Sequence, residues 1–203
     1  MTLIDSRRDI AAAVAHAASR HGARTIREQE VFPWIGKGLR IMFKGLLPDS
    51  DKDRIGAMVE TYKERFFDRC AVHSMLYPGV TETLEELKRR GIMLAVATTK
   101  MTFMARRVCE AFGLDRLVDH VQGTDDFPEK PDPAVLLAAC KALGAPASEA
   151  VAVGDTVMDV RAAKKAGCFS AAVNYGIGSR EELAAAKPDI LIDSFEGILT
   201  VFD

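Results

Sequence analysis

The stretch Val151-Ala152-Val153-Gly154-Asp155-Thr156-Val157-Met158-Asp159 decides the fold, because a short apolar run stops there at a glycine and two carboxylates. The run is typical of a buried strand, and residues 160–166, which are rich in alanine and cationic side chains and end at Gly167, predict a helix with a glycine C-cap. In open α/β sheets, ligands bind outside the carboxyl ends of the strands. We therefore expect Asp155 at that edge of a sheet, with Asp159 one helical turn further on.

The two carboxylates admit two interpretations. Hard oxygen ligands at the mouth of a sheet suit Mg²⁺, which takes one or two carboxylates together with substrate oxygens. Alternatively, Asp155 or Asp159 simply caps the helix, since aspartate is favoured at the N-cap and near the positive end of the helix dipole. The choice between them depends on polar residues elsewhere in the chain.

Length and composition restrict the class of protein. The chain has 203 residues, 48% of them hydrophobic and 28% charged, which suits one core and a small accessory domain. A net charge of -2 gives no reason to expect nucleic acid or an anionic membrane as a partner. The four cysteines are scattered, as in proteins of a reducing compartment, and no signal peptide or long apolar run is present. We expect a cytoplasmic location and buried thiols.

The chain changes character at Tyr77-Pro78-Gly79. Before this turn signal, helical periodicity predicts helices at 6–19, from Gly38 to before Pro48, and at 51–68. After it, strands alternate with helices. Helices are expected at 81–90, 102–112, 133–143, 160–166 and 180–186, and strands at 92–97, 118–122, 151–154, 169–173 and 190–192. This pattern predicts an α/β fold, a parallel sheet covered on both faces, with the early helices as a separate cap.

Polar side chains follow three of the expected strands. Thr98 and Thr99 come after the first and Lys130 after the second, while Asp155 and Asp159 follow the third. Hydroxyl and ammonium groups hold phosphoryl oxygens, and carboxylates anchor Mg²⁺. Taken singly, a threonine at a strand end is usually a loop residue and a lysine a solvated charge. Lys130 precedes Pro131, however, which favours an extended conformation and restricts its position.

These residues resemble three motifs of the phosphatases of the haloacid dehalogenase superfamily. Thr98, Lys130-Pro131-Asp132-Pro133 and Gly154-Asp155-xxx-Asp159 match the second, third and fourth motifs in order and spacing. Further stretches resemble the phosphoglycolate phosphatase branch: Leu76-Tyr77-Pro78-Gly79-Val80, Ala97-Thr98-Thr99-Lys100, Asn174-Tyr175-Gly176 and Pro188-Asp189. Thr99 departs from the branch, in which asparagine is common. The resemblance covers essentially the whole chain.

The N-terminal part resembles the cap of that branch. Trp34-Ile35-Gly36-Lys37-Gly38-Leu39-Arg40 is similar to its substrate-facing loop, which makes Gly36, Lys37, Gly38 and Arg40 candidate substrate contacts. The resemblance implies a Rossmann-like core with an inserted helical cap. The expected division is 1–6 as a remnant of the first core motif, 7–76 as the cap and 77–203 as the core.

The first motif of the family departs most from the pattern. In the family, an apolar strand in the middle of the sheet precedes Asp-x-Asp-x-Thr, whose first aspartate is the nucleophile and whose second is a general acid/base. Thr2-Leu3-Ile4-Asp5-Ser6 matches only the tail of that motif. The first core strand and both catalytic aspartates are therefore expected to be absent from this chain, and we interpret Asp5 as an acid at a helix start.

The resemblance implies a Mg²⁺-dependent phosphomonoester hydrolase that forms an aspartyl-phosphate. Thr98, Thr99 and Lys130 would bind phosphate, and Asp155 would bind the metal directly with support from Asp159. The implied partner is a small phosphorylated metabolite, most simply phosphoglycolate. A sugar-phosphate mutase uses the same core, and a non-catalytic binding or scaffold protein is the alternative that the missing motif favours. The oligomeric state stays open, a homodimer included.

Overall fold

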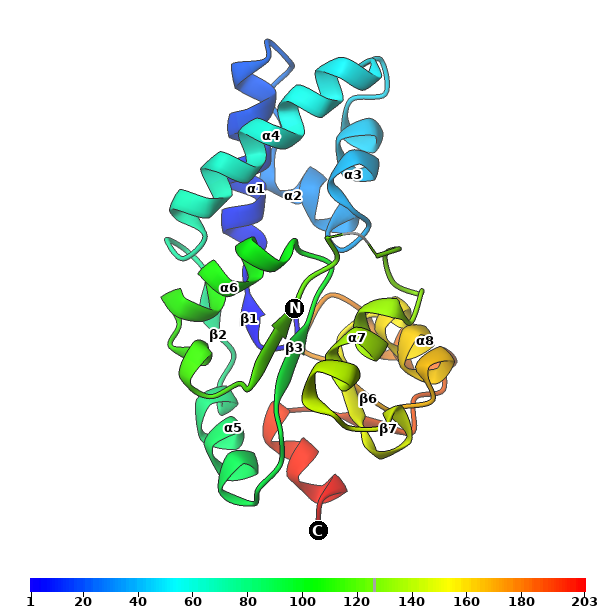
Figure 1. Ribbon diagram of the computed structural model, residues 1–203. Coiled ribbons are helices and arrows are strands. Elements are labelled where there is room, and N and C mark those ends of the chain that lie inside the picture. The colour runs from blue at the N-terminus through cyan, green and yellow to red at the C-terminus, as the bar shows by residue number, and fades with distance from the viewer. Residues whose placement is uncertain (126) are drawn as a thin grey trace. The chain divides into compact units, whose positions relative to one another are not determined.

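The computed structural model describes residues 1–125 and 127–203, and the chain divides into two compact units (Figure 1). An α/β unit comprises Met1–Asp5 and Leu76–Asp203, and a helical unit comprises Ser6–Met75. The helical unit lies within a residue of the cap range expected from the sequence. Its action as a cap stays a prediction.

The helical unit is organised by its two longest helices, which pack against each other. Its elements are α1 (Arg7–Arg20), α2 (Glu28–Val31), η1 (Phe32–Trp34), α3 (Leu39–Leu46) and α4 (Lys52–Arg69). Asp51 starts α4 by accepting a 2.8 Å hydrogen bond from the backbone N–H of Arg54, as an N-cap should. The Tyr62 ring stacks on Phe66 at 5.6 Å, and both are buried. Such burial contributes about 1.5–3 kcal/mol per large side chain.

The α/β unit contains short strands, and all pairs beyond the first two strands are parallel. Its strands are β1 (Ile4–Asp5), β2 (Met75–Leu76), β3 (Ala95–Ala97), β4 (His120–Gln122), β5 (Val151–Gly154), β6 (Phe169–Val173) and β7 (Ile190–Ile192). β3 pairs with β4, and β5-β6-β7 form a second parallel ladder, while β1 pairs with β2. Within residues 1–125 and 127–203 no ladder joins β3 to β5.

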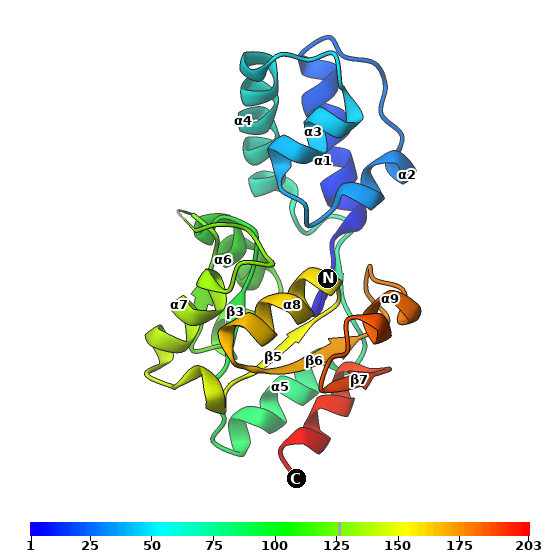
Figure 2. The same cartoon turned by 90° about the vertical axis from the view of Figure 1, so that its right-hand side faces the viewer.

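Helices cover the strands of the α/β unit (Figure 2). They are α5 (Val80–Arg89), α6 (Thr102–Ala111), η2 (Leu114–Arg116), α7 (Ala134–Leu143), η3 (Ala147–Glu149), α8 (Val157–Ala166), α9 (Arg180–Ala185) and η4 (Phe195–Val201). Alternate residues of β6 serve the two faces of its ladder: Ala171 and Val173 join the core under α5 and η4, whereas Ala172 packs with α8 and α9. The strands are therefore covered by helices on both faces, as in a layered α/β fold.

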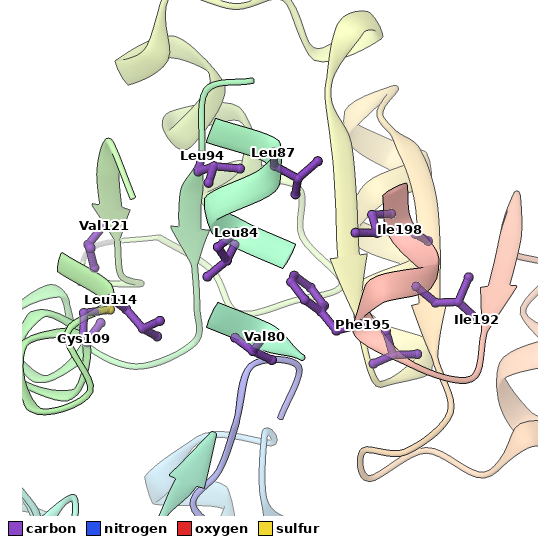
Figure 3. Close-up of a cluster of buried hydrophobic side chains, with 13 residues drawn as sticks. Val80, Leu84, Leu87, Leu94, Cys109, Leu114, Val121, Ile192, Phe195 and Ile198 are labelled. Carbon is purple, nitrogen blue, oxygen red and sulfur yellow. The ribbon is translucent and has the colours of Figure 1, made fainter. Parts of the chain in front are cut away.

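The larger core cluster lies between α5 and η4 and the adjoining strands (Figure 3). Val80 and Leu84 of α5 meet Phe195 and Ile198 of η4, all at most 4% exposed. β6, which is paired on both sides, has four buried residues of five, whereas β3 has none. Among the described residues, β3 pairs only with β4 and β5 pairs only with β6, so each of these strands has one unpaired edge. The absence of the family's first strand stays a prediction.

Most predicted elements fall within a few residues of their expected bounds, but two interpretations were wrong. The helix expected from Val160 begins at Val157, because Thr156 caps it. Asp5, interpreted as an acid at a helix start, lies in β1, and Asp9 is the acid in the first turn of α1. The helices α2 and η4 were not predicted from the sequence.

Candidate phosphate and metal site

Lys130 joins two of the polar strand ends that the sequence singled out. Its ammonium donates to Asp159 Oδ1 at 2.7 Å and to the backbone carbonyl of Ala97 at 3.1 Å. Ala97 is the last residue of β3 and immediately precedes Thr98. The side chains of Lys130 and Asp159 are only 10% and 18% exposed. A long-range, largely desolvated ion pair thus connects the end of β3 with the first turn of α8.

Asp159 also caps its own helix. Thr156 is the N-cap of α8, and its N–H and hydroxyl donate to Asp159 Oδ2 at 3.0 and 2.6 Å, which completes a capping box. Burial acts to raise the pKa of the Asp159 carboxyl, but the charge of Lys130 and the hydrogen bonds from Lys130 and Thr156 outweigh it and hold the pKa below its usual range. The capping interpretation therefore holds for Asp159, together with its pairing to Lys130.

Asp155 is held by a different set of donors. The carboxylate is 2% exposed, and Oδ2 accepts a 3.0 Å hydrogen bond from the backbone N–H of Ile177. Oδ1 accepts from the Thr2 hydroxyl at 3.2 Å and pairs with the ammonium of Met1. Its backbone carbonyl accepts from Gly178 N–H at 2.9 Å. The β6–α9 loop thus fixes Oδ2, and Oδ1 lies next to the Thr2 side chain.

The side chains of Asp159 and Asp155 occupy the space in which Gly154 and Gly176 would otherwise carry a Cβ atom. A Cβ at Gly154 would lie 2.6 Å from Asp159 Cγ, and a Cβ at Gly176 would lie 2.5 Å from Asp155 Oδ2. Both distances are shorter than any that a real Cβ atom makes with a neighbouring atom. Glycine at these two positions is therefore required for the carboxylates to occupy their places.

The expected phosphate-binding threonines differ in their surroundings. Thr98 donates its backbone N–H to Gln122 at 3.0 Å, and its carbonyl accepts from the Thr124 hydroxyl at 2.7 Å. Its own hydroxyl accepts a 3.3 Å hydrogen bond from Lys100 N–H. The hydroxyl of Thr99 makes no hydrogen bond within the described part of the chain. Thr98 is thus fixed at the end of β3 next to the carbonyl that Lys130 contacts.

Sequence reasoning missed the residues that fix Asp155. The Tyr175 hydroxyl donates to the Thr2 carbonyl at 2.7 Å, and its ring lies 4.5 Å from that of Tyr77. Burial, with the charge of Asp155 second, raises the pKa of Tyr175, so its hydroxyl stays a donor. The glycines of the loop that contains Gly176 and Gly178 were the available signal, because close backbone approach needs them.

The donor set fits Mg²⁺ with one direct carboxylate. Asp155 Oδ2 is held by the Ile177 N–H and Oδ1 accepts a 3.2 Å hydrogen bond from the Thr2 side chain, whereas both Asp159 oxygens are engaged by Lys130 and Thr156. Within residues 1–125 and 127–203 no cluster of three or more histidine, cysteine or acidic side chains could hold a metal ion. A single carboxylate oxygen of this kind is compatible with Mg²⁺, which keeps several waters and takes substrate oxygens.

The four candidate substrate contacts from the N-terminal segment lie in the helical unit. Gly36 and Gly38 both have positive φ, of 86° and 84°, and Gly38 is the N-cap of α3. The Lys37 ammonium lies 5.2 Å above the Trp34 ring, a cation–π contact. Arg40 is exposed on α3 and has no ion pair or hydrogen bond among the described residues. Their contact with a substrate stays a prediction.

Comparison with known proteins establishes the class. The model of the haloacid dehalogenase-like hydrolase family matches residues 1–173, and the chain belongs to this family. It is similar to a phosphoglycolate phosphatase of Pasteurella multocida, with 34% identity over 100% of this chain and 94% of the relative. Phosphoglycolate phosphatase 1 of Pseudomonas aeruginosa is also 34% identical, over 100% of this chain and 76% of the relative.

Solved structures agree with this assignment. A predicted phosphoglycolate phosphatase from Haemophilus somnus superposes with a TM-score of 0.90 at 30% identity, over 99% of this chain and 93% of that one. A predicted phosphatase from Clostridium acetobutylicum gives a TM-score of 0.86 at 25% identity, over 98% and 93%. The expected α/β fold of the haloacid dehalogenase type is confirmed. Among the described residues, no helix is long and apolar enough to cross a bilayer.

Proposed function

We propose that this chain forms the phosphate- and magnesium-binding part of a phosphomonoester hydrolase that acts on a small phosphorylated metabolite, phosphoglycolate or a close analogue. The proposal rests on the buried Lys130–Asp159 pair at the end of β3. It rests also on the Asp155 carboxylate, which the backbone N–H of Ile177 holds in place. Relatives that match nearly all of the chain are named phosphoglycolate phosphatases, which supports the choice of substrate.

Each residue of the site has a proposed role. The Lys130 ammonium and the Thr98 and Thr99 hydroxyls hold phosphoryl oxygens, since cationic and hydroxyl donors at strand ends suit a phosphate dianion. Asp155 is the direct Mg²⁺ ligand, and Asp159 supports the site by holding Lys130. A bound Mg²⁺ offsets repulsion between an anionic nucleophile and the phosphate dianion.

The proposed chemistry is covalent catalysis by a carboxylate. In it an aspartate attacks phosphorus, the alcohol leaves, an aspartyl-phosphate forms, and water then releases inorganic phosphate. We assign no residue of 1–203 as that nucleophile, because Thr2-Leu3-Ile4-Asp5-Ser6 resembles only the tail of the family's first motif. Gly36, Lys37, Gly38 and Arg40 are proposed to select the organic part of the substrate.

The test compares residues 1–203 with a version that carries an added upstream strand ending in Asp-x-Asp. The long form should release phosphate from phosphoglycolate only with Mg²⁺ and without a sugar-phosphate activator, and the short form should be slower by about 10⁴-fold or more. A dependence on a sugar bisphosphate would indicate a mutase instead. Equal rates in the two forms would overturn the assignment of the nucleophile, and no turnover by either would leave a binding protein.

A further inference from the structure

A small cavity in the helical unit is lined by charge that the site above does not use. Its volume is about 50 Å³, and its lining comes from both long helices and from the segment after α4. The lining residues are Asp9, Ala12, Ala13, Arg65, Arg69, Val72 and His73. All seven belong to the helical unit, so the cavity is complete within one compact part of the chain.

The two arginines lie on one face of α4. Arg65 and Arg69 are four residues apart, which places their side chains one above the other on the helix surface. Neither guanidinium has a hydrogen bond or an ion pair with any residue of 1–125 or 127–203. Arg24 and Arg54 of the same unit do have partners, Glu30 at 2.8 Å and the His21 carbonyl at 2.8 Å, whereas Arg40 resembles Arg65 and Arg69 in having none among the described residues.

The one acid in the cavity cannot serve as the missing counter-ion. Asp9 is 4% exposed, and His73 N–H donates to both of its oxygens at 3.0 Å. Ser74 adds its N–H at 2.8 Å and its hydroxyl at 2.6 Å, both to Oδ2. Three of these contacts fall on Oδ2 and one on Oδ1, and all of them come from the neutral donors of residues 73 and 74. Asp9 is therefore engaged by residues 73 and 74, and within the described part of the chain it forms no ion pair with either arginine.

The small alanines of α1 provide the room. Ala12 and Ala13 carry only methyl side chains, and the rest of the lining comes from Asp9, Arg65, Arg69, Val72 and His73. The lining carries a net charge of +1 with His73 neutral, from two arginines and one aspartate. A guanidinium binds planar or tetrahedral oxyanions through a fork of N–H donors.

We propose that this cavity of the helical unit is a binding site for a small oxyanion, of the phosphate or sulfate class, held by Arg65 and Arg69 as its counter-ions. The site is separate from the one built around Asp155 and does not depend on the proposed hydrolysis. Its ligand completes the charge balance that Asp9 leaves open. Arg65 is half-buried and Arg69 is exposed, so water competes for both guanidinium groups, and we expect a dissociation constant for phosphate on the order of 1 mM.

The experiment is a titration of the ¹⁵N-labelled full chain with inorganic phosphate, at constant ionic strength, followed by amide chemical shifts. The amides of Ala12, Ala13, Val72 and His73 should shift together and saturate. In R65Q/R69Q the affinity should fall by about tenfold or more, because charge-assisted hydrogen bonds are lost. Glutamine is a good helix former, so α4 should persist, and thermal unfolding checks this.

Two matched controls separate a site from general electrostatics. R20Q removes the same charge from the end of α1, outside the cavity lining, and should leave the titration unchanged. R65K/R69K keeps both charges but loses the fork of donors, so its affinity should fall between those of the parent and R65Q/R69Q. This variant also carries the test if R65Q/R69Q does not fold.

Several results would overturn the proposal. These are the absence of saturable shifts at the cavity amides, an R65Q/R69Q titration like the parent's, and an equal loss in R20Q. A D155N variant keeps the cavity intact. If D155N abolishes the shifts at Ala12 and His73, they report the site of the α/β unit and the cavity is not a second site; if D155N loses phosphate binding only in the α/β unit, the two proposals stand apart.

Discussion

Replacing Lys130 by methionine tests the ion pair on which the candidate site depends. Methionine keeps an apolar stem of similar length and removes only the ammonium group. The lost interactions are the 2.7 Å bond to Asp159 Oδ1 and the 3.1 Å bond to the Ala97 carbonyl. Asp159 retains its two hydrogen bonds from Thr156 on the other oxygen, so the carboxylate is left half satisfied.

The expected cost follows from these contacts and their burial. A hydrogen bond to a charged group contributes about 1.5–3 kcal/mol, and one to a neutral carbonyl about 0.5–1.5 kcal/mol. Breaking a fully buried ion pair costs about 3–5 kcal/mol. Since Asp159 is 18% exposed and stays capped, we expect K130M to lower the free energy of unfolding by about 2–4 kcal/mol.

Lys88 provides a matched control within the same unit. It also donates to one carboxylate and one backbone carbonyl, Asp119 Oδ1 and Leu117 O, both at 3.1 Å, but the two side chains are 40% and 38% exposed. K88M should therefore cost less than about 1 kcal/mol. Urea unfolding with unchanged m-values measures both variants. If K130M costs no more than K88M, the pair is not desolvated and the reasoning about the site fails.

Three further predictions concern single positions. Gly176→Ala should displace the Asp155 carboxylate and destabilise the chain by about 1–3 kcal/mol, seen by urea unfolding; an unchanged midpoint would refute the close packing. Gly56→Ala, in the interior of α4 where the nearest atom to a new Cβ is 3.8 Å away, should raise stability by about 0.5–1 kcal/mol; a lower melting temperature would contradict it. Asp9→Asn replaces an acceptor of Ser74 N–H and hydroxyl and should cost about 1–3 kcal/mol; faster amide exchange at His73 and Ser74 checks the cause, and unchanged exchange would count against it.

The long periodic elements could be predicted from the sequence, because their apolar spacing reflects burial directly. The helix expected at 51–68 is Lys52–Arg69, and the strand expected at 169–173 is Phe169–Val173. The strand expected at 92–97 is shorter, at Ala95–Ala97. Leu94 N–H is taken by the Asp119 side chain at 2.8 Å instead of by a strand, and a side-chain acceptor distant in sequence leaves no periodic signal.

The site was predictable in part. The proximity of Lys130 to Asp159 and to the end of β3 followed from the rule that strand ends meet at one edge. The environment of Asp155 did not follow, because backbone groups of the β6–α9 loop create it, and any residue supplies an N–H like that of Ile177. The capping of α8 by Thr156 and Asp159 was visible as a pattern but could not be separated from metal binding by sequence alone.

We propose Asp155 as the direct Mg²⁺ ligand beside the Lys130–Asp159 pair. Calorimetric titration of Mg²⁺ into the parent chain, in the presence of phosphate, tests it against D155N and against D119N as a control for removing an acidic side chain elsewhere. We expect saturable binding that D155N weakens by at least about tenfold and that D119N leaves unchanged. Equal Mg²⁺ binding by the parent and D155N would contradict it.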